Sequence, residues 1–335
     1  MKKILFFLLL LIISFAAWFF LAPDTNFSEG KKALYIKTGS TFDDVMDSVE
    51  LNNIVQFPII FKYVTQIISY DKNIKPGKYV IQNESSLYKI IKTLRSGSQT
   101  PVNLVIIKLR TREDFAQKVA ANFECDSTKF INYITNNDSL ADYGLDTNTV
   151  MTAIIPNTYT LVWTTPASKI FKRLFGAQEK FWTSERKQKA AALSLTPKQA
   201  YTLASIVEEE TTKDEDKGKI ASVYLNRRND GMKLAADPTV KYAMKNFGLK
   251  RIYDKYLLTP SPYNTYQHLG LPPGPICTPS IKTIDAVLNE PATNYLYFVA
   301  KPDWSGLSNF ASTFAEHEVN ARNYQRFLDS LYLNR

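Results

Sequence analysis

The chain has 335 residues, of which 45% are hydrophobic and 22% are charged, and its formal net charge at pH 7 is +9. Its lysines and arginines are dispersed and no recognition motif accompanies them, so the positive charge does not indicate a nucleic-acid partner. The two cysteines, Cys125 and Cys277, lie far apart and exclude a disulfide framework, which leaves either two buried thiols or one pair.

The N-terminus begins with Lys2 and Lys3, and an apolar stretch follows from Ile4 to Ala22. About 20 such residues can cross a bilayer as a helix. A cleaved signal peptide is the competing interpretation, but its apolar region is usually shorter and ends at a small-x-small site. Bulky Trp18 suits a membrane interface instead, and the lysines place the N-terminus in the cytoplasm. We therefore predict a transmembrane anchor over residues 1–22, with the rest of the chain outside the inner (plasma) membrane.

Residues 23–32 are expected to form a polar tether, and residues 33–100 a small domain. Apolar runs at 34–36 and 79–81 predict two strands, and amphipathic segments between and after them predict helices. Strand–helix–helix–strand units of this kind form small α+β domains. Residues 101–335 then remain for a larger domain in which helices and strands are mixed, so the predicted fold class is α+β.

The clearest helix of the larger domain begins at Thr196, a suitable N-cap, with Pro197 at its first position and Gln199 completing a capping box. Apolar residues recur along one face of this helix as far as Thr211. Glu209 lies opposite that face and is expected to be solvated, whereas Glu210 lies at its apolar margin.

A carboxyl group held against apolar surface loses hydration of its charged form. Its pKa therefore rises, and it can donate a proton near neutral pH, as a glycosidase acid must. The alternative for Glu208, Glu209 and Glu210 is that they simply form a solvated acidic end of the helix.

Further residues that could line a cleft follow this helix. Asn226 and Arg227 end a second helix that starts near Asp214, where they either contact a sugar or peptide or stabilise the helix terminus. Asp237 is expected to cap a third helix with Pro238 at its first position. A stiff Gly/Pro-rich loop follows, and its tyrosine faces and amide suit sugar rings and their hydroxyl groups; the loop residues are Tyr263, Asn264 and Tyr266.

Metal and nucleotide chemistry find no support in the sequence. Its only histidines are His268 and His317, and no metal-ligand spacing, glycine-rich phosphate loop or serine nucleophile elbow occurs. We therefore predict no cofactor and no metal.

Several motifs occur in a fixed order between Ala204 and Val299. They are Ala204–Thr211, Ala221–Arg228, Gly231–Leu234, Asp237–Val240, Ser261–Tyr266, Gly270–Ile276 and Tyr295–Val299. This series closely resembles the endolytic murein transglycosylases of the YceG-like (MltG) family. Two positions depart from the family pattern: Asn157 stands where relatives usually have an aspartate, and Ser308 where they often have a histidine.

The resemblance implies that residues 101–335 are a catalytic domain and that 33–100 are LysM-like and contact glycan chains. It implies that Glu210, which directly precedes Thr211, is the general acid. The reaction would cleave the bond between N-acetylmuramic acid and N-acetylglucosamine inside peptidoglycan strands and leave 1,6-anhydromuramyl ends. Substrate contacts, a weaker expectation, fall on Glu208, Asn226, Arg227, Asp237, Tyr263, Asn264 and Tyr266. Cell-wall synthases would be partners.

Two other classes remain open from the sequence. A hydrolytic muramidase would use Glu210 as acid and either Glu208 or Asp237 as base. A membrane-anchored scaffold would bind glycan without cleaving it, and a spacer role for residues 33–100 is equally compatible with the pattern.

Overall fold

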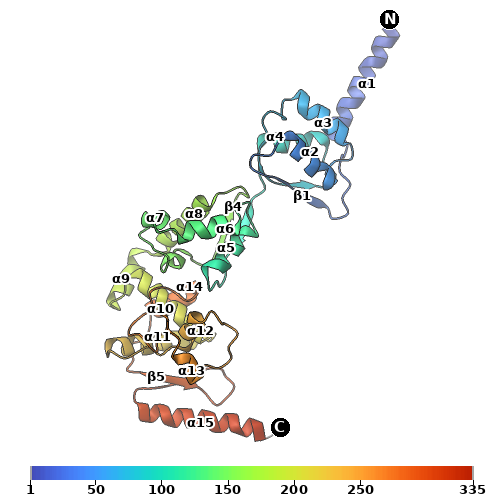
Figure 1. Ribbon diagram of the computed structural model, residues 1–335. Helices are drawn as coiled ribbons and strands as arrows, with labels where there is room; N and C mark the ends of the chain where they lie inside the picture. The colour runs from blue at the N-terminus through green and yellow to red at the C-terminus, as the bar shows by residue number, and fades with distance from the viewer. Residues whose placement is uncertain (1, 334–335) are drawn as a thin grey trace. The chain divides into compact units, whose positions relative to one another are not determined.

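The computed structural model of the protein describes residues 2–333, which fold into two compact units. The first unit runs from the N-terminus to Leu104 and adds residues 118–126 and 160–167; the second contains residues 105–117, 127–159 and the chain from Ser168 onward. Helices dominate, and the strands of the described residues form three two-stranded sheets (Figure 1). The fold is therefore mixed α+β, as predicted.

The first unit begins with α1 (Lys2–Leu21), an apolar helix. Among residues 2–333 it is the one helix that is long and apolar enough to cross a membrane. Its last turn contacts the rest of the unit, since the rings of Trp18 and Phe57 lie 5.8 Å apart and those of Phe20 and Tyr88 lie 4.6 Å apart.

The remainder of the first unit is a strand–helix–helix–strand arrangement followed by a third helix. Its elements are β1 (Lys31–Ile36), α2 (Phe42–Leu51), α3 (Pro58–Ile67), β2 (Gly77–Gln82) and α4 (Leu87–Ser96). The two strands pair antiparallel, from Lys31 opposite Gln82 to Ile36 opposite Gly77. Their buried side chains, including Leu34 and Tyr79, form one core with the helices. The apolar runs and the amphipathic segments therefore predicted these strands and helices correctly.

The predicted tether over residues 23–32 is wrong, because these residues are part of the folded unit. The Asp24 amide donates to the Ser85 carbonyl at 2.9 Å, and the Phe27 amide donates to the Asn83 side chain at 2.8 Å. Phe27 is also 5% exposed within the core of the unit. Residues 23–32 are mostly polar, but they pack on the unit through Phe27 and through the hydrogen bonds of their backbone.

The rest of the chain is largely helical. Its elements are β3 (Val102–Val105), α5 (Arg112–Ala120), α6 (Ser127–Thr135), α7 (Asn137–Ala141), the 3₁₀ turn η1 (Val150–Ala153), β4 (Thr158–Leu161), α8 (Ala167–Phe181), α9 (Ser184–Ala192), α10 (Pro197–Glu210), α11 (Asp214–Asn229), α12 (Asp237–Ala243), α13 (Asp254–Leu257), α14 (Ile281–Leu288), β5 (Tyr297–Ala300), β6 (Ser308–Ala311) and α15 (Phe314–Leu333).

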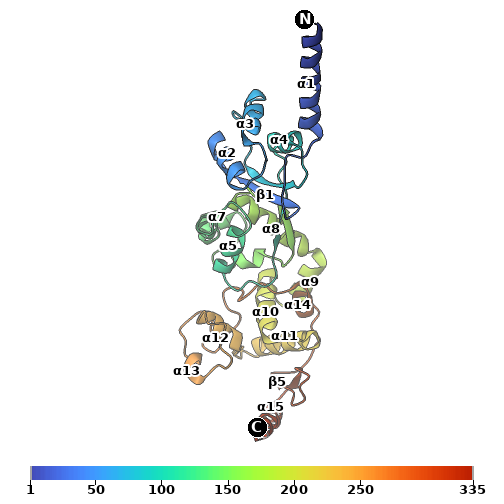
Figure 2. The same cartoon turned by 90° about the vertical axis from the view of Figure 1, so that its right-hand side faces the viewer.

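Helix α10 forms the centre of the second unit and has the capping box predicted for it. The Thr196 side chain accepts from the Gln199 amide, and the Gln199 side chain accepts from the Thr196 amide. The helix packs against α9, α11, α12 and α14 (Figure 2). Every residue from Ala200 to Val207 is buried. The prediction of a single buried face was therefore too narrow, because neighbouring helices and the loops at Ile154 and Ile276 together cover α10.

Two further segments show how capping and pairing shape this unit. The basic segment from Phe171 to Lys189 is divided between α8 and α9, because the Thr183 side chain caps the second helix. The segment near Tyr295–Val299 contributes β5, whose residues are partly exposed and pair with β6.

We predict that Gly274→Ala destabilises the second unit. A Cβ atom at this position would lie 2.0 Å from the Asn148 carbonyl oxygen, so the backbone would have to move. Overpacking of this kind costs about 1–3 kcal/mol. The change should lower the denaturant midpoint of the full-length protein in detergent. Gly176→Ala is the control, because nothing lies within 4 Å of its added Cβ and alanine favours a helix interior by up to about 1 kcal/mol. Equal midpoints for the two variants would contradict this packing.

Candidate active site

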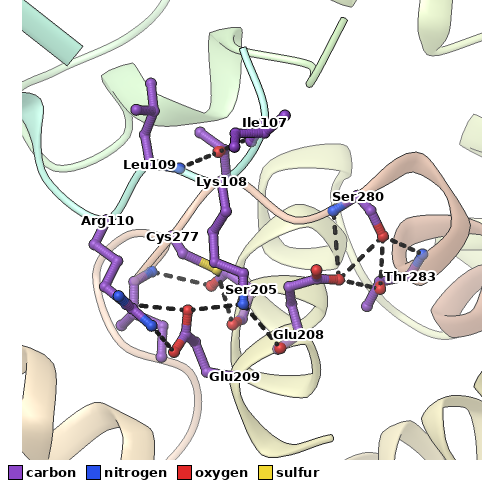
Figure 3. Close-up of polar contacts among 12 residues, drawn as sticks. Ile107, Lys108, Leu109, Arg110, Ser205, Glu208, Glu209, Cys277, Ser280 and Thr283 are labelled. Carbon is purple, nitrogen blue, oxygen red and sulfur yellow. Dashed lines mark hydrogen bonds and ion pairs between the residues drawn. The ribbon is translucent and has the colours of Figure 1, made fainter. Parts of the chain in front are cut away.

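Three consecutive glutamates end α10, and each contacts a different part of the second unit. Residues one or two apart on a helix do not face each other, so the three carboxylates diverge. Figure 3 shows that Glu208 points toward Ser280 and Thr283, whereas Glu209 points toward Lys108 and Arg110. Glu210 contacts α11 instead. The end of α10 thereby joins three segments that are distant in sequence.

The Glu208 carboxylate binds the first turn of α14. It accepts hydrogen bonds from the Ser280 hydroxyl at 3.0 Å and from the Thr283 hydroxyl, and the Lys217 ammonium lies 3.7 Å away. Its side chain is only 15% exposed. This geometry gives Glu208 a structural role and argues against its use as a second catalytic carboxylate. Glu208 also lines a cavity of about 460 Å³, so its expected role as a substrate contact stays a prediction.

Glu209 was expected to be solvated, and this expectation is wrong. Its carboxylate accepts from Arg110 Nε at 3.2 Å and Nη2 at 2.9 Å, and Lys108 Nζ lies 3.3 Å away. Burial disfavours its charged form, but the hydrogen bonds from Arg110 and the charge of Lys108 outweigh burial and hold the Glu209 pKa below its usual value. Glu209 is therefore an ionised carboxylate within a salt bridge.

Glu210 has the opposite electrostatic behaviour. Burial raises its pKa from 4.5 to about 7, and the nearby negative charge of Asp237 adds to that effect. The hydroxyl of Tyr224 on α11 donates to Glu210 Oε1 at 2.5 Å and partly offsets the rise. Tyr224 is 2% exposed, so its hydroxyl is held in the core. Of the three glutamates, Glu210 is the one whose pKa burial raises, while its side chain stays partly exposed. Its expected contact with the apolar face of the helix stays a prediction.

Asp237 lies near Glu210 but does not cap α12 as predicted. Ala236 occupies the N-cap position without a side-chain bond, and Asp237 is the first residue of the helix. Its carboxylate instead accepts from the Tyr266 hydroxyl at 2.7 Å. Burial raises the pKa of Tyr266, and the hydrogen bond to Asp237 and the charges of Asp237 and Glu210 raise it further, so the structure brings these three side chains together.

Asn226 and Arg227 are brought to the same region, but their donors bind backbone carbonyls. The Asn226 amide donates to Thr293 and Tyr295 carbonyls, each at 2.9 Å. Arg227 donates to the Leu296 carbonyl at 2.7 Å and to the Leu234 carbonyl at 2.6 Å. These contacts support the structural alternative for both residues, which hold the chain before β5 against α11.

Two of the loop residues, Asn264 and Tyr263, differ in their exposure to solvent. Asn264 is fully buried, donates to the Leu257 and Thr259 carbonyls and accepts from the Tyr266 amide. Its amide therefore shapes the loop and does not face a cleft. Tyr263 is partly exposed, and its ring lies 4.7 Å from that of Tyr242.

The site contains a partner that sequence reasoning missed. This partner is Tyr224, since no local signal pairs it with a glutamate fourteen residues earlier. Lys241 on α12 was also missed, although its charge acts on Glu210. No group of three or more His, Cys, Asp or Glu side chains that could hold a metal ion occurs within residues 2–333.

This arrangement places a partly exposed carboxyl group with a raised pKa at the end of the central helix of a mixed α+β unit. The chain belongs to the YceG-like family, whose model matches residues 34–323. A crystal structure of a YceG-like protein from Listeria monocytogenes has a similar fold, with a TM-score of 0.58 and 26% sequence identity over 87% of this chain and 99% of that one.

Two curated relatives are each named endolytic murein transglycosylase. The Bacillus subtilis protein is 43% identical over 123 residues, which are 37% of this chain and 33% of that protein. The protein from Streptococcus pneumoniae strain R6 is 26% identical over 85% of this chain and 57% of its own length. The match therefore spans about one third to just over half of these relatives.

We predict that the free energy of unfolding of Glu210→Gln increases relative to that of wild type as the pH rises. The folded-state pKa of about 7 exceeds the ordinary value of 4.5, so wild type loses stability as pH rises between these values. Glutamine lacks this titration. The difference in free energy of unfolding, measured with denaturant at about pH 5 and about pH 8, should shift in favour of the variant at the higher pH. Exposed Glu215→Gln should show no comparable shift, and a pH-independent difference for Glu210→Gln would contradict the raised pKa.

Proposed function

We propose that the protein is an endolytic lytic transglycosylase that cleaves the bond between N-acetylmuramic acid and N-acetylglucosamine inside peptidoglycan strands. The observation that carries this proposal is the Glu210 carboxyl, whose burial raises its pKa to about 7. At neutral pH a large fraction of this group holds a proton, as general-acid catalysis requires. The names of the curated relatives support the same reaction.

In the first step, Glu210 donates its proton to the glycosidic oxygen. The bond from muramyl C1 to that oxygen breaks, N-acetylglucosamine leaves with a free hydroxyl, and positive charge develops on the muramyl ring as in an oxocarbenium ion. In the second step, the Glu210 carboxylate removes the proton from the C6 hydroxyl of the same muramyl residue. The C6 oxygen bonds to C1, which closes the 1,6-anhydro ring and returns the proton to Glu210.

A single carboxylate suffices for this cycle, whereas glycoside hydrolases typically use two. The environment of Glu208 supports this choice over a muramidase with Glu208 as its base, because the Glu208 carboxylate is bound to the first turn of α14. The Tyr224 hydroxyl occupies Oε1 of Glu210. Oε2 is therefore the oxygen we assign to proton transfer.

The proposal extends to the place of the protein in the cell. Residues Ile4–Ala22, which contain most of α1, would anchor it in the inner membrane, with the N-terminus cytoplasmic and the chain that follows periplasmic. The strand–helix–helix–strand unit would act as a LysM-like contact to glycan chains. Cleavage close to the membrane, beside cell-wall synthases, would limit the length of nascent strands.

We expect the full-length protein in detergent to release internal glycan fragments with 1,6-anhydromuramyl ends from purified peptidoglycan. Glu210→Gln should lower that rate by at least about a hundredfold, since general-acid catalysis contributes roughly 10²–10⁴. Mass spectrometry of the fragments measures both outcomes. Glu215→Gln, an exposed neighbour on α11, is the control and should cleave normally.

The same experiment separates the other classes. Reducing ends would indicate a muramidase, and binding without fragments from wild type would indicate a scaffold. Normal cleavage by Glu210→Gln would refute the assignment of the acid.

A further inference from the structure

A small cavity lies beside the end of α10, on the side of Glu209. Its volume is about 90 Å³, and its lining residues are Arg110, Glu209, Pro238, Lys241, Phe247 and Ile276. One water molecule needs roughly 10–15 Å³ of such space. The cavity is therefore large enough for a carboxylate group together with a few waters.

Positive charge prevails in this cavity. Three cations, Lys108, Arg110 and Lys241, lie in or beside it, and Glu209 is its one carboxylate. Glu209 is already bound by two of them, with Arg110 contributing Nε and Nη2. Within the part of the chain that the structure describes, Arg110 Nη1 and the Lys241 ammonium have no hydrogen-bond or ion-pair partner. Two unused donors thus line a cavity with excess positive charge.

The neighbouring contacts fix this arrangement. The Arg110 guanidinium lies over the Phe247 ring, 5.0 Å from its centroid, which holds it at the cavity wall. Lys241 lies on α12 one turn after Asp237, but Asp237 bonds to the Tyr266 hydroxyl and leaves Lys241 unpaired. Lys241 also acts electrostatically on Glu210. Lys241 therefore lines the cavity and also acts on the proposed acid, Glu210.

We propose that this cavity is a subsite for a carboxylate of the glycan substrate, bound by Lys241 and Arg110 beside the bond that is cleaved. The subsite rests on the proposed function, since it presumes a muramyl residue at Glu210. Two parts of the substrate carry such a carboxylate. One is the peptide attached to the lactyl group, and the other is the lactyl group itself once the peptide has been removed. Charge-assisted hydrogen bonds to a guanidinium and an ammonium would orient either group.

Binding is the direct test, because it does not depend on turnover. Full-length protein carrying Glu210→Gln is compared with the same protein carrying in addition Lys241→Met, in detergent, by calorimetric titration with purified glycan strands. Methionine keeps the length of the side chain and removes its charge. Lys233→Met is the matched control, because Lys233 is exposed and lies outside the cavity.

Three preparations of strands distinguish the sources of the carboxylate: strands with intact peptides, strands with the peptide carboxylates amidated, and strands stripped of peptide by an amidase. Lys241→Met should raise the Kd about fivefold for the preparation that supplies the ligand, and the effect should shrink at high salt, as for a partly exposed charge pair of about 1 kcal/mol. Dependence on intact peptides alone identifies the peptide, and dependence on stripped strands identifies the lactyl group.

The subsite is refuted if Lys241→Met and Lys233→Met bind all three preparations equally well. This result is distinguishable from failure of the proposed function, in which wild type would bind but release no anhydromuramyl fragments. A Lys241-dependent Kd would support the subsite even if the products had reducing ends.

Discussion

The burial of α10 on every side is the constraint on which the second unit depends. A helix surrounded by other helices must end somewhere, and this one ends in three carboxylates whose charges are costly to bury without partners. Two of them are compensated: Glu208 by hydroxyl groups at the start of α14, and Glu209 by Lys108 and Arg110. These contacts join the segment after β3, helix α14 and the end of α10, so that they fix the position of the third carboxylate.

Within residues 2–333, no cation forms an ion pair with the third carboxylate, Glu210. Its hydrogen-bond partner is the neutral hydroxyl of Tyr224. The largest effect of a charged group on its pKa comes from the negative Asp237, which the cations Lys241 and Arg227 oppose. A neutral donor stabilises the charged form less than an ion pair does, so burial prevails and the pKa rises. The same helix end thus supplies two structural carboxylates and one that holds a proton near neutral pH, which is a division of roles suited to single-carboxyl glycan cleavage.

Local sequence signals predicted local structure well. The capping box of Thr196 and Gln199, and the cap of α14 at Ser280, follow from neighbouring residues and are present. Long-range partners could not be predicted in this way. Glu209 lies about one hundred residues after Lys108 and Arg110, so helical periodicity alone placed it in solvent. Asn264 was assigned to a cleft by residue type, but the carbonyls that bind its amide became identifiable only in the folded loop.

Site-resolved titration of the glutamate carboxyls tests the central claim most directly. Carboxyl-¹³C-glutamate can be incorporated into the full-length protein, and the Glu209→Gln and Glu210→Gln variants assign the two resonances by difference. Glu210 should titrate with a pKa of about 7, and the pKa of Glu209 should lie below its usual value. A Glu210 resonance that titrates near the ordinary value of 4.5 would contradict this claim, because the proposed acid would then be ionised at neutral pH.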